Sequence, residues 1–154
     1  MPQFLDRALQ GLSPELLAAS TLYDKSPLLE HLWHVRDCDT DLYGMRIHRI
    51  LNESLPRLDP VEVGLWPEQR NYLSRGSEQA LREFASYRAS LIATLRAADT
   101  ATLARCGVRA DGTQINVLGV LEQLLDHDRD HRERIGATLR GMLAAATQGA
   151  WPVA

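Results

Sequence analysis

The sequence has little of several features that define common protein classes. Its two cysteines, Cys38 and Cys106, are too few for a disulfide framework and favour a reducing compartment that keeps them as thiols. It contains no apolar run of about eighteen residues that could span a bilayer. Positive charge is also limited, because the net charge is −3 and no basic face is visible, so nucleic acid is not an expected partner. Residues 1–20 lack a continuous apolar segment, and we therefore expect no secretory signal and a cytoplasmic protein.

The remaining composition is that of an ordinary globular protein. Hydrophobic residues make up 45% and charged residues 24% of the 154 positions. This length suits one hydrophobic core, which predicts a single domain over residues 1–154. Helical spacing dominates and alternating strand patterns are scarce, so the predicted fold class is all-α.

The clearest predicted helix runs from Thr113, as its N-cap, to about Leu143. Its apolar residues recur at steps of three and four and form one stripe that comprises Val117, Val120, Leu121, Leu124, Ile135, Leu139 and Met142. A short helix is predicted from Pro2 to about Gly11, and Ser13–Glu15 could begin another. We expect the closing residues 151–154 to fold back or fray.

Two further long helices are predicted in the first two thirds of the chain. One begins near Ser26–Pro27 and reaches about Ser54, and the other runs from Ser77, its expected cap, to about Ala98. Proline and glycine residues between them predict a long crossover with a short helix near 67–73. Arg88 falls on the apolar face of the later helix, and we interpret it as a side chain that reaches solvent at the bundle edge.

The strongest local motif is the pair His127 and His131 near the middle of the last helix. Residues four apart share a helical face, and steps of three and four from Leu124 place both imidazoles toward the core. Buried imidazoles need hydrogen-bond or metal partners, and a metal would satisfy one nitrogen of each ring. The alternative to a metal site is a half-exposed pair of polar side chains. The zinc-protease motif is excluded, because it requires glutamate where this chain has Asp128.

A third metal ligand is expected from the helix that begins near residue 26. His31, His34, Cys38 and His48 lie close to one side of that helix, and spacing alone does not choose between His31 and His34. Cys38 would suit zinc as a thiolate, but a lone helical cysteine is also typical of a small buried apolar residue. His48 is expected to be a partly exposed surface histidine.

Several stretches of the chain resemble the DinB family of metal-dependent proteins. They are residues 29–37, 46–51 and 125–131, with further matches at 84–88 and 112–113, and the resemblance extends from about residue 28 to 139. It implies a four-helix bundle with a long crossover between the second and third helices. In that family, a histidine followed by an acidic residue on the second helix and an HxxxH pair on the last helix bind a divalent metal. Carried over to this sequence, the implied ligands are His34, which precedes Asp37, with His127 and His131.

The resemblance also implies a class of chemistry. Family members of known activity include thiol transferases that use low-molecular-weight thiols and a mycothiol-dependent isomerase. We therefore expect a metal-dependent enzyme with zinc or nickel, an open coordination position and a small-molecule substrate, with thiol transfer as the first interpretation. Metal-dependent hydrolysis is the second. There are two further alternatives. The first is a non-catalytic, metal-stabilised module with a closed four-ligand site, and the second is a polar layer of histidines without a metal.

Two expectations concern the surroundings of this site. Family members usually have a longer first helix and a tryptophan-serine pair at the start of the second, where this chain has Lys25–Ser26. The bundle could therefore be incomplete or be completed by a second copy, and we expect a homodimer. Some acidic residues near the histidines could accept hydrogen bonds from the second ring nitrogens, but solvent-facing charges on long helices are the commoner explanation; the residues are Glu30, Asp126 and Asp130.

Overall fold

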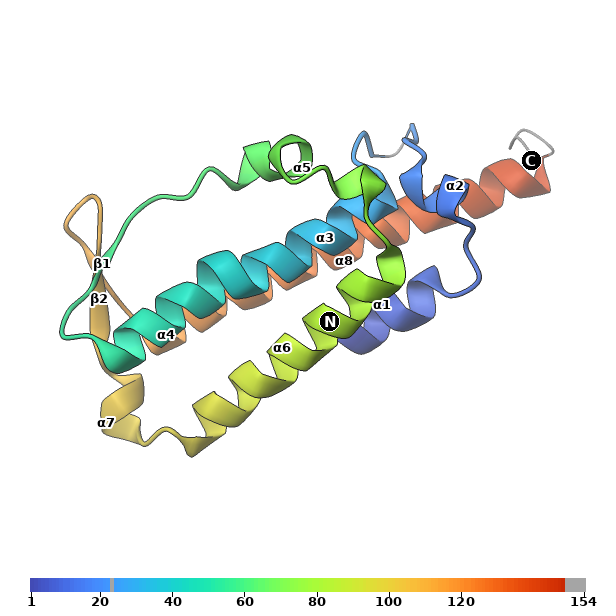
Figure 1. The fold of residues 1–154 in the computed structure, drawn as a ribbon. Coiled ribbons are helices and arrows are strands. Elements are labelled where there is room, and N and C mark those ends of the chain that lie inside the picture. The colour runs from blue at the N-terminus through green and yellow to red at the C-terminus, as the bar shows by residue number, and fades with distance from the viewer. Residues whose placement is uncertain (23, 149–154) are drawn as a thin grey trace.

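The computed structural model describes residues 1–22 and 24–148, and three long helical segments form its body (Figure 1). The first consists of α3 (Leu28–Cys38) and α4 (Met45–Asn52), joined without a break by a π-helical stretch, η1 (Asp39–Gly44). The second is α6 (Ser77–Ala97), and the third is α8 (Val117–Thr147).

The shorter N-terminal helix α1 (Pro2–Leu9) packs against α6 and α8 and acts as the fourth helix of the bundle. It is followed by α2 (Pro14–Ala18), which begins where Ser13–Glu15 predicted a helix start: the Ser13 hydroxyl accepts a hydrogen bond from the backbone N–H of Leu16. The expectation for residues 151–154 falls outside the described part of the chain.

The predicted helix boundaries hold within a few residues, but two predicted caps were wrong. Asn116, not Thr113, caps α8, because its Oδ1 accepts a hydrogen bond from the N–H of Gly119 at 2.9 Å. Thr113 instead lies in a turn, where its N–H donates to Asp111 Oδ1. At the start of α6 the N-cap is Gly76, without a capping side chain, while Ser77 is the first helical residue.

A small sheet that helical spacing did not predict closes one end of the bundle. Its strands are β1 (Arg57–Leu58), β2 (Cys106–Arg109) and β3 (Gln114–Asn116), in the order β1-β2-β3. β1 is parallel to β2, and β2 is antiparallel to β3. Such short strands carry too few residues to show an alternating pattern. Figure 1 shows the sheet beside the short helix α7 (Thr100–Leu103).

The predicted crossover connects α4 to α6 and lies along α3. After β1 it forms three short turns of helix, η2 (Val63–Leu65), α5 (Trp66–Gln69) and η3 (Tyr72–Ser74). The helix expected near 67–73 is interrupted at Asn71, whose φ of 50° is left-handed. Both α5 and η3 contact α3, so the crossover covers the part of α3 that carries the candidate ligands.

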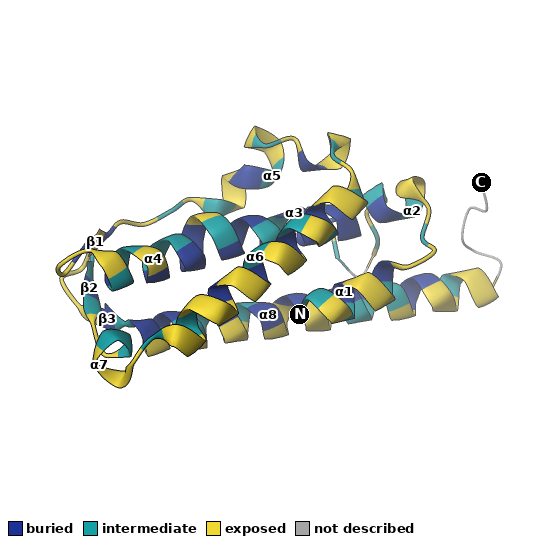
Figure 2. Cartoon of the chain, turned by 60° about the horizontal axis from the view of Figure 1, so that its bottom comes forward, coloured by how far each residue is buried: buried dark blue, intermediate teal, exposed yellow. Residues whose placement is uncertain are grey.

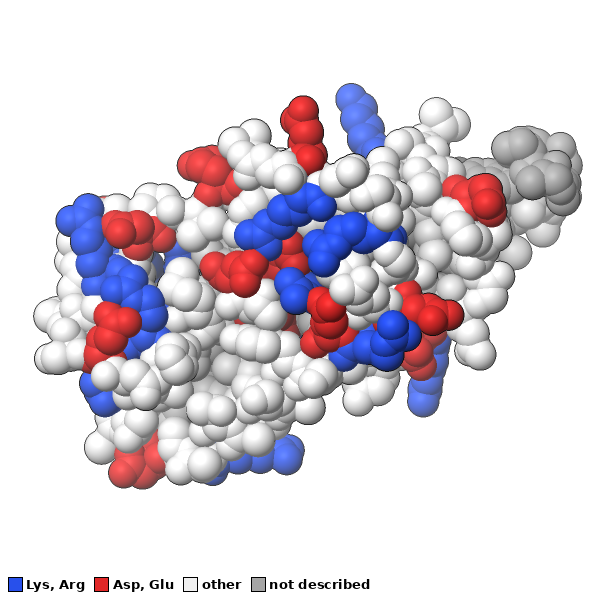
Figure 3. Space-filling view, in the orientation of Figure 1, with Lys and Arg blue, Asp and Glu red and all other residues white. Residues whose placement is uncertain are grey.

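The buried residues, most of them apolar, lie on the sides of the helices that face one another, and exposed residues lie on the outer sides (Figure 2). Trp33, Tyr72 and Phe84 are the largest fully buried side chains. On the face shown in Figure 3, acidic and basic side chains are interspersed in small groups. No helix within residues 1–22 and 24–148 has the length and hydropathy required to cross a membrane.

Arg88 was expected to reach solvent at the bundle edge, but this prediction was wrong, because the residue is buried. Its side chain is buried between two carboxylates: Nε and Nη2 donate to Asp39 at 2.6 Å, and Nη1 and Nη2 donate to Asp128 at 2.7 and 3.1 Å. Asp39 belongs to the π-helical stretch and Asp128 to α8, so this charged cluster joins three elements of the bundle. Hydrophobic periodicity placed Arg88 on the core-facing side of its helix. It could not identify Asp39 and Asp128 as partners, because both are far from Arg88 in the sequence.

Candidate metal centre

Three histidines from two helices meet between α3 and α8. His34 comes from α3, whereas His127 and His131 lie one turn apart on α8. One ring nitrogen from each lies within 4.8 Å of the other two. Their ring centroids are separated by 4.4 Å for His127 and His131, and by 5.3 and 5.0 Å from His34 to each of these. The structure therefore brings together the three residues that the sequence analysis selected.

Local sequence explains why the α8 pair faces inward. Leu124 and Ile135 are buried before and after the pair, at the helical spacing that places all four side chains toward α3. His131 is buried and His127 is half-buried. The apolar stripe of α8 thus continues through the motif, with imidazoles in place of aliphatic side chains.

The polar atoms of this cluster are incompletely paired. Both ring nitrogens of His127 are inaccessible to solvent and have no hydrogen-bond partner within the described part of the chain. Leaving buried polar atoms unpaired costs free energy, and a bound cation would pair one of these nitrogens. Three imidazoles are a known ligand set for catalytic zinc and are also suited to nickel. The residues present therefore fit a divalent metal.

The electrostatics of the cluster keep its imidazoles neutral near pH 7. Burial, reinforced by the neighbouring imidazoles, lowers the pKa of His34 to about 4 and that of His131 to about 2. Burial also lowers the pKa of His127. The neutral imidazole is the form that binds metals, so the site need not release protons from these rings when a cation enters.

Cys38, the alternative ligand from the sequence analysis, is buried beside the cluster rather than in it. Its Sγ lies 3.4 Å from His34 Nε2, but it does not belong to the group of converging metal-binding atoms found among the described residues. Burial raises the pKa of the thiol to about 12, and a zinc ligand would have to be the thiolate. His48 is exposed, as expected, and contacts Asn52.

The acidic residues considered as possible hydrogen-bond acceptors for the histidines make no such bond within the described part of the chain. Asp126 and Asp130 are exposed, and they face Arg129 and Arg134 rather than the rings. Glu30 makes no hydrogen bond to an imidazole within the described residues, although it lies near them. The favoured interpretation, solvent-facing charges on a long helix, is therefore confirmed for Asp126 and Asp130.

The carboxylate that does contact a histidine is Asp24, which the sequence analysis missed. Its Oδ2 lies 3.0 Å from His31 Nε2, and His31 Nδ1 lies 2.8 Å from His131 Nδ1. His31 therefore borders the cluster without joining the three converging ligands. Asp24 precedes α3 in a loop, where helical spacing carries no information about which side chains meet.

A cavity of about 180 Å³ leads from the surface to the histidines. His34 and His131 line its inner part, Val63 and Pro67 of the crossover line one side, and the charged residues Glu30 and Arg134 also line it. Burial and the charge of Asp24 raise the pKa of Glu30.

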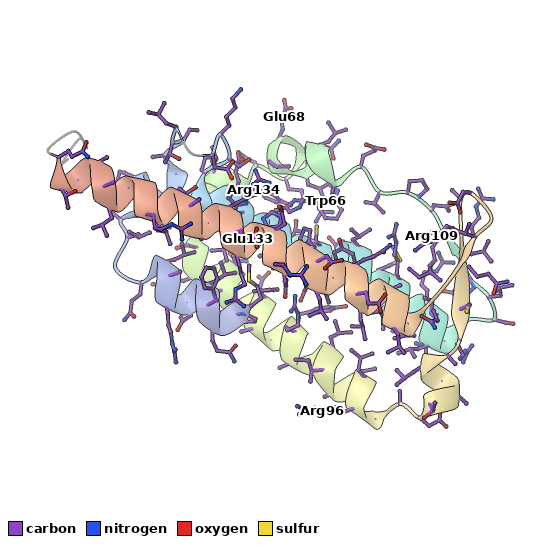
Figure 4. The ribbon with its side chains drawn as sticks, turned by 180° about the vertical axis from the view of Figure 1, so that it is seen from behind. Trp66, Glu68, Arg96, Arg109, Glu133 and Arg134 are labelled. Atoms are coloured by element: carbon purple, nitrogen blue, oxygen red, sulfur yellow. The ribbon has the colours of Figure 1, made fainter. Side chains whose placement is uncertain are left out.

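The crossover also covers the cluster with an aromatic side chain. Trp66 is buried, with its ring centroid 6.4 Å from that of His34. Figure 4 shows Trp66 and Arg134 on the same side of the molecule, close to the middle of α8, whereas Arg109 lies beside the small sheet. The cluster is thus covered on the crossover side and reached through a polar opening.

Comparisons with known proteins agree with this geometry. The model of the DinB superfamily matches residues 1–135. The fold is similar to that of YfiT from Bacillus subtilis, described as a probable metal-dependent hydrolase with an unusual four-helix bundle topology. That similarity has a TM-score of 0.82 at 19% identity and covers 92% of this chain and 81% of YfiT, so the predicted four-helix bundle is confirmed. No curated protein matches this chain.

Proposed function

Because this chain belongs to the DinB superfamily, we propose that it is a metal-dependent enzyme whose nucleophile is a low-molecular-weight thiol. His34, His127 and His131 would hold a divalent cation, zinc or nickel. The observation that carries most weight is their convergence, with ring nitrogens within 4.8 Å of one another and both nitrogens of His127 unpaired. When bound, such a cation lowers the pKa of a thiol or a water molecule and so supplies a nucleophile at neutral pH.

The cavity supports a catalytic role, because it gives a small molecule access to two of the ligands. Three histidines also leave a coordination position open, which catalytic sites need. Arg134 would bind a substrate carboxylate: its Nε and Nη2 donate to Asp24, whereas its Nη1 is engaged only at 3.9 Å, by Asp130 Oδ2, among the contacts of the described residues. Trp66 would limit the entry of water from the crossover side.

Hydrolysis is a second candidate, favoured by Glu30. This carboxylate lines the cavity, and its raised pKa makes it a stronger base than an ordinary glutamate. Glu30 would accept a proton from water. The likeness to YfiT, described as a probable metal-dependent hydrolase, points the same way.

The two non-catalytic alternatives have less support. A closed site would need a fourth protein ligand, and the nearby Cys38 does not belong to the group of converging metal-binding atoms among the described residues. A metal-free polar layer would leave the two buried nitrogens of His127 unpaired.

Metal analysis combined with a thiol-consumption assay tests the proposal. Protein purified without a histidine tag should contain about one divalent ion per chain, and His34→Ala and His131→Ala should lose it, whereas the control His48→Gln should keep it. Thiol consumption with a panel of electrophiles should stop after chelation and return when zinc or nickel is added. Wild-type metal content in the alanine variants would contradict the ligand assignment. Activity that survives complete demetallation would reject the mechanism, and chelator-sensitive ester or amide hydrolysis without thiol would favour the second candidate.

The homodimer remains a prediction, although α1 provides the fourth helix within one chain, so a second copy is not needed to complete the bundle. Leu118 and Leu125, seven residues apart on α8, are 51% and 59% exposed, which gives a second copy an apolar surface to cover. Sedimentation at micromolar concentration should give the mass of two chains. A monomeric mass that persists as concentration rises would contradict the prediction.

A further inference from the structure

A continuous series of hydrogen bonds connects the loop before α3 to one of the proposed ligands. Asp24 Oδ2 lies 3.0 Å from His31 Nε2, and His31 Nδ1 lies 2.8 Å from His131 Nδ1. The side chains of Asp24 and His31 are only 7% and 2% exposed, and His131 is 5% exposed. Water therefore competes little for these contacts.

Asp24 can only accept hydrogen bonds in this series. Arg134 donates from Nε to Oδ2 at 2.8 Å and from Nη2 to Oδ1 at 3.0 Å, and the backbone N–H of Ser26 donates to Oδ1 at 3.0 Å. Burial alone would raise the pKa of Asp24, but the hydrogen bonds from Arg134 and Ser26 outweigh it and lower the pKa to about 2. The carboxylate is therefore ionised at neutral pH, and its orientation is fixed.

Because Asp24 accepts a hydrogen bond at one end of the series, it determines which ring nitrogen of His31 and which ring nitrogen of His131 carries a proton. A neutral imidazole has one donor nitrogen and one acceptor nitrogen. Because Asp24 accepts, Nε2 of His31 must carry its proton and Nδ1 of His31 must be the acceptor. The Nδ1 of His131 must then donate, which leaves the lone pair on Nε2 of His131.

His31 is not suited to bind the same ion as His131 through the nitrogens that touch. Two nitrogens on one tetrahedral zinc, each about 2.0 to 2.1 Å from the metal, lie about 3.3 Å apart. The observed 2.8 Å between the Nδ1 atoms of His31 and His131 is a hydrogen-bond distance. His31 therefore contacts a ligand and holds it in place.

We propose that Asp24 and His31 are positioning residues that fix His131 in the tautomer with its proton on Nδ1, so that Nε2 is available to the metal. Metal-binding histidines commonly donate their second nitrogen directly to a carboxylate. Here a second histidine stands between the carboxylate and the ligand. Arg134, one turn after His131 on α8, anchors the carboxylate to the helix that carries the ligand. This inference rests on the metal site of the proposed function.

Nitrogen NMR of the full chain labelled with ¹⁵N-histidine tests the tautomer directly. In metal-free protein at neutral pH, the Nδ1 of His131 should have the chemical shift of a protonated nitrogen and Nε2 that of a bare one. His31 should show the opposite tautomer. Both assignments come from the hydrogen-bond series and need no assay of activity.

Zinc affinity, measured by competition with a chelator, tests the consequence. His31→Leu removes the acceptor and should weaken zinc binding by about 10- to 100-fold, the usual effect of losing such a partner. His31→Asn keeps an amide oxygen near the place of Nδ1 and should recover most of that loss. Asp24→Asn keeps the shape but has one oxygen for donors from Arg134, Ser26 and His31, so it should give an intermediate loss and a mixed tautomer at His131. His48→Gln is the matched control and should bind zinc as the wild type does.

Several outcomes would overturn the inference. These are an Nε2–H tautomer of His131 in the metal-free protein, zinc coordination by His31 Nδ1, or wild-type zinc affinity in His31→Leu. The tautomer is decided even if the protein binds no zinc, so a failed metal site and a failed positioning role can be told apart. Circular dichroism confirms folding of each variant, and His31→Asn and Asp24→Asn decide the question if His31→Leu does not fold.

Discussion

His127 and Asp128 are neighbours on α8, but their side chains belong to polar clusters of opposite character. Asp128 accepts two hydrogen bonds from Arg88, which also binds Asp39, so each charge in that cluster faces an opposite charge. His127 lies among imidazoles, and both of its ring nitrogens are buried without a partner in the described part of the chain. The two clusters lie within one turn of the same helix.

The contrast separates a structural cluster from a binding cluster. Buried polar groups in folded proteins are nearly always paired, and a complete network needs nothing more. The Arg88 cluster is complete and joins α6, α8 and the π-helical stretch. The histidine cluster is incomplete among the described residues, and two of its members, His34 and His131, line a cavity, so an additional group could enter and satisfy it. We therefore expect the first cluster to control stability and the second to control metal affinity.

The largest expected effect comes from removing the shared cation of the Arg88 cluster. Arg88→Met leaves Asp39 and Asp128 buried without a counter-charge, and loss of one partner of a buried ion pair typically costs about 3–5 kcal/mol. Urea unfolding of metal-free protein measures this loss. The combined variant Arg88→Met, Asp39→Asn, Asp128→Asn removes the uncompensated charges and should recover much of it. A loss below about 1 kcal/mol for Arg88→Met would show that the cluster is not structural.

His127→Leu tests the expectation that the histidine cluster controls metal affinity and not stability. It removes two unpaired buried nitrogens, so the free energy of unfolding of metal-free protein should stay within about 1 kcal/mol of wild type or rise. Zinc affinity should fall at least about 100-fold, equivalent to about 2.7 kcal/mol, because one of three ligands is lost. Competition with a chelator measures the affinity, and Asp126→Asn on the same helix is the control. Marked destabilisation of the metal-free variant would mean that His127 has a packing role instead.

Acid should destabilise the metal-free protein through the histidine cluster. Burial lowers the pKa of His34 to about 4 and that of His131 to about 2, whereas an unfolded histidine titrates near 6.5. The unfolded state therefore takes up protons first as pH falls. Stability of metal-free protein should be full above about pH 6.5 and should fall from there toward pH 4, by up to about 1.4 kcal/mol per pH unit for each extra proton.

Urea unfolding at a series of pH values measures this slope. His127→Leu should reduce it, because one of the histidines with a lowered pKa is gone and its neighbours no longer face that ring. His48→Gln should leave the slope unchanged. Stability that stays constant between pH 7 and 5 would contradict the neutral, buried state of the cluster.

The sequence predicts those features of the fold that repeat at regular spacing. The long helices appear close to the predicted bounds because their apolar residues recur every three or four positions. Asn116 was missed as the cap of α8 because the helix was predicted to begin at Thr113, whereas β3 lies between Thr113 and the first helical residue. β1 and β2 pair residues about fifty positions apart, and strands of two and four residues carry no detectable pattern.

The same distinction applies to the two polar clusters. The HxxxH pair lies on one helix, so spacing alone placed both rings toward the core, and the family resemblance selected His34 over His31. The partners of Arg88 lie forty and forty-nine residues away, and Asp24 lies in a loop. Such pairs depend on how helices and loops pack in three dimensions. No periodic pattern in one sequence identifies them.

The smallest expected effect concerns Cys38, which lies beside the histidine cluster without completing it. Cys38→Ala removes a buried thiol 3.4 Å from His34 Nε2, and a small cavity with one weak hydrogen bond lost should cost about 1 kcal/mol in unfolding free energy. Zinc affinity should change by less than about threefold, because the Sγ of Cys38 lies outside the group of atoms that converge as metal ligands among the described residues. A loss of affinity comparable to that of His127→Leu would make Cys38 a fourth ligand. The histidine cluster would then be closed, and its role would be structural like that of the Arg88 cluster.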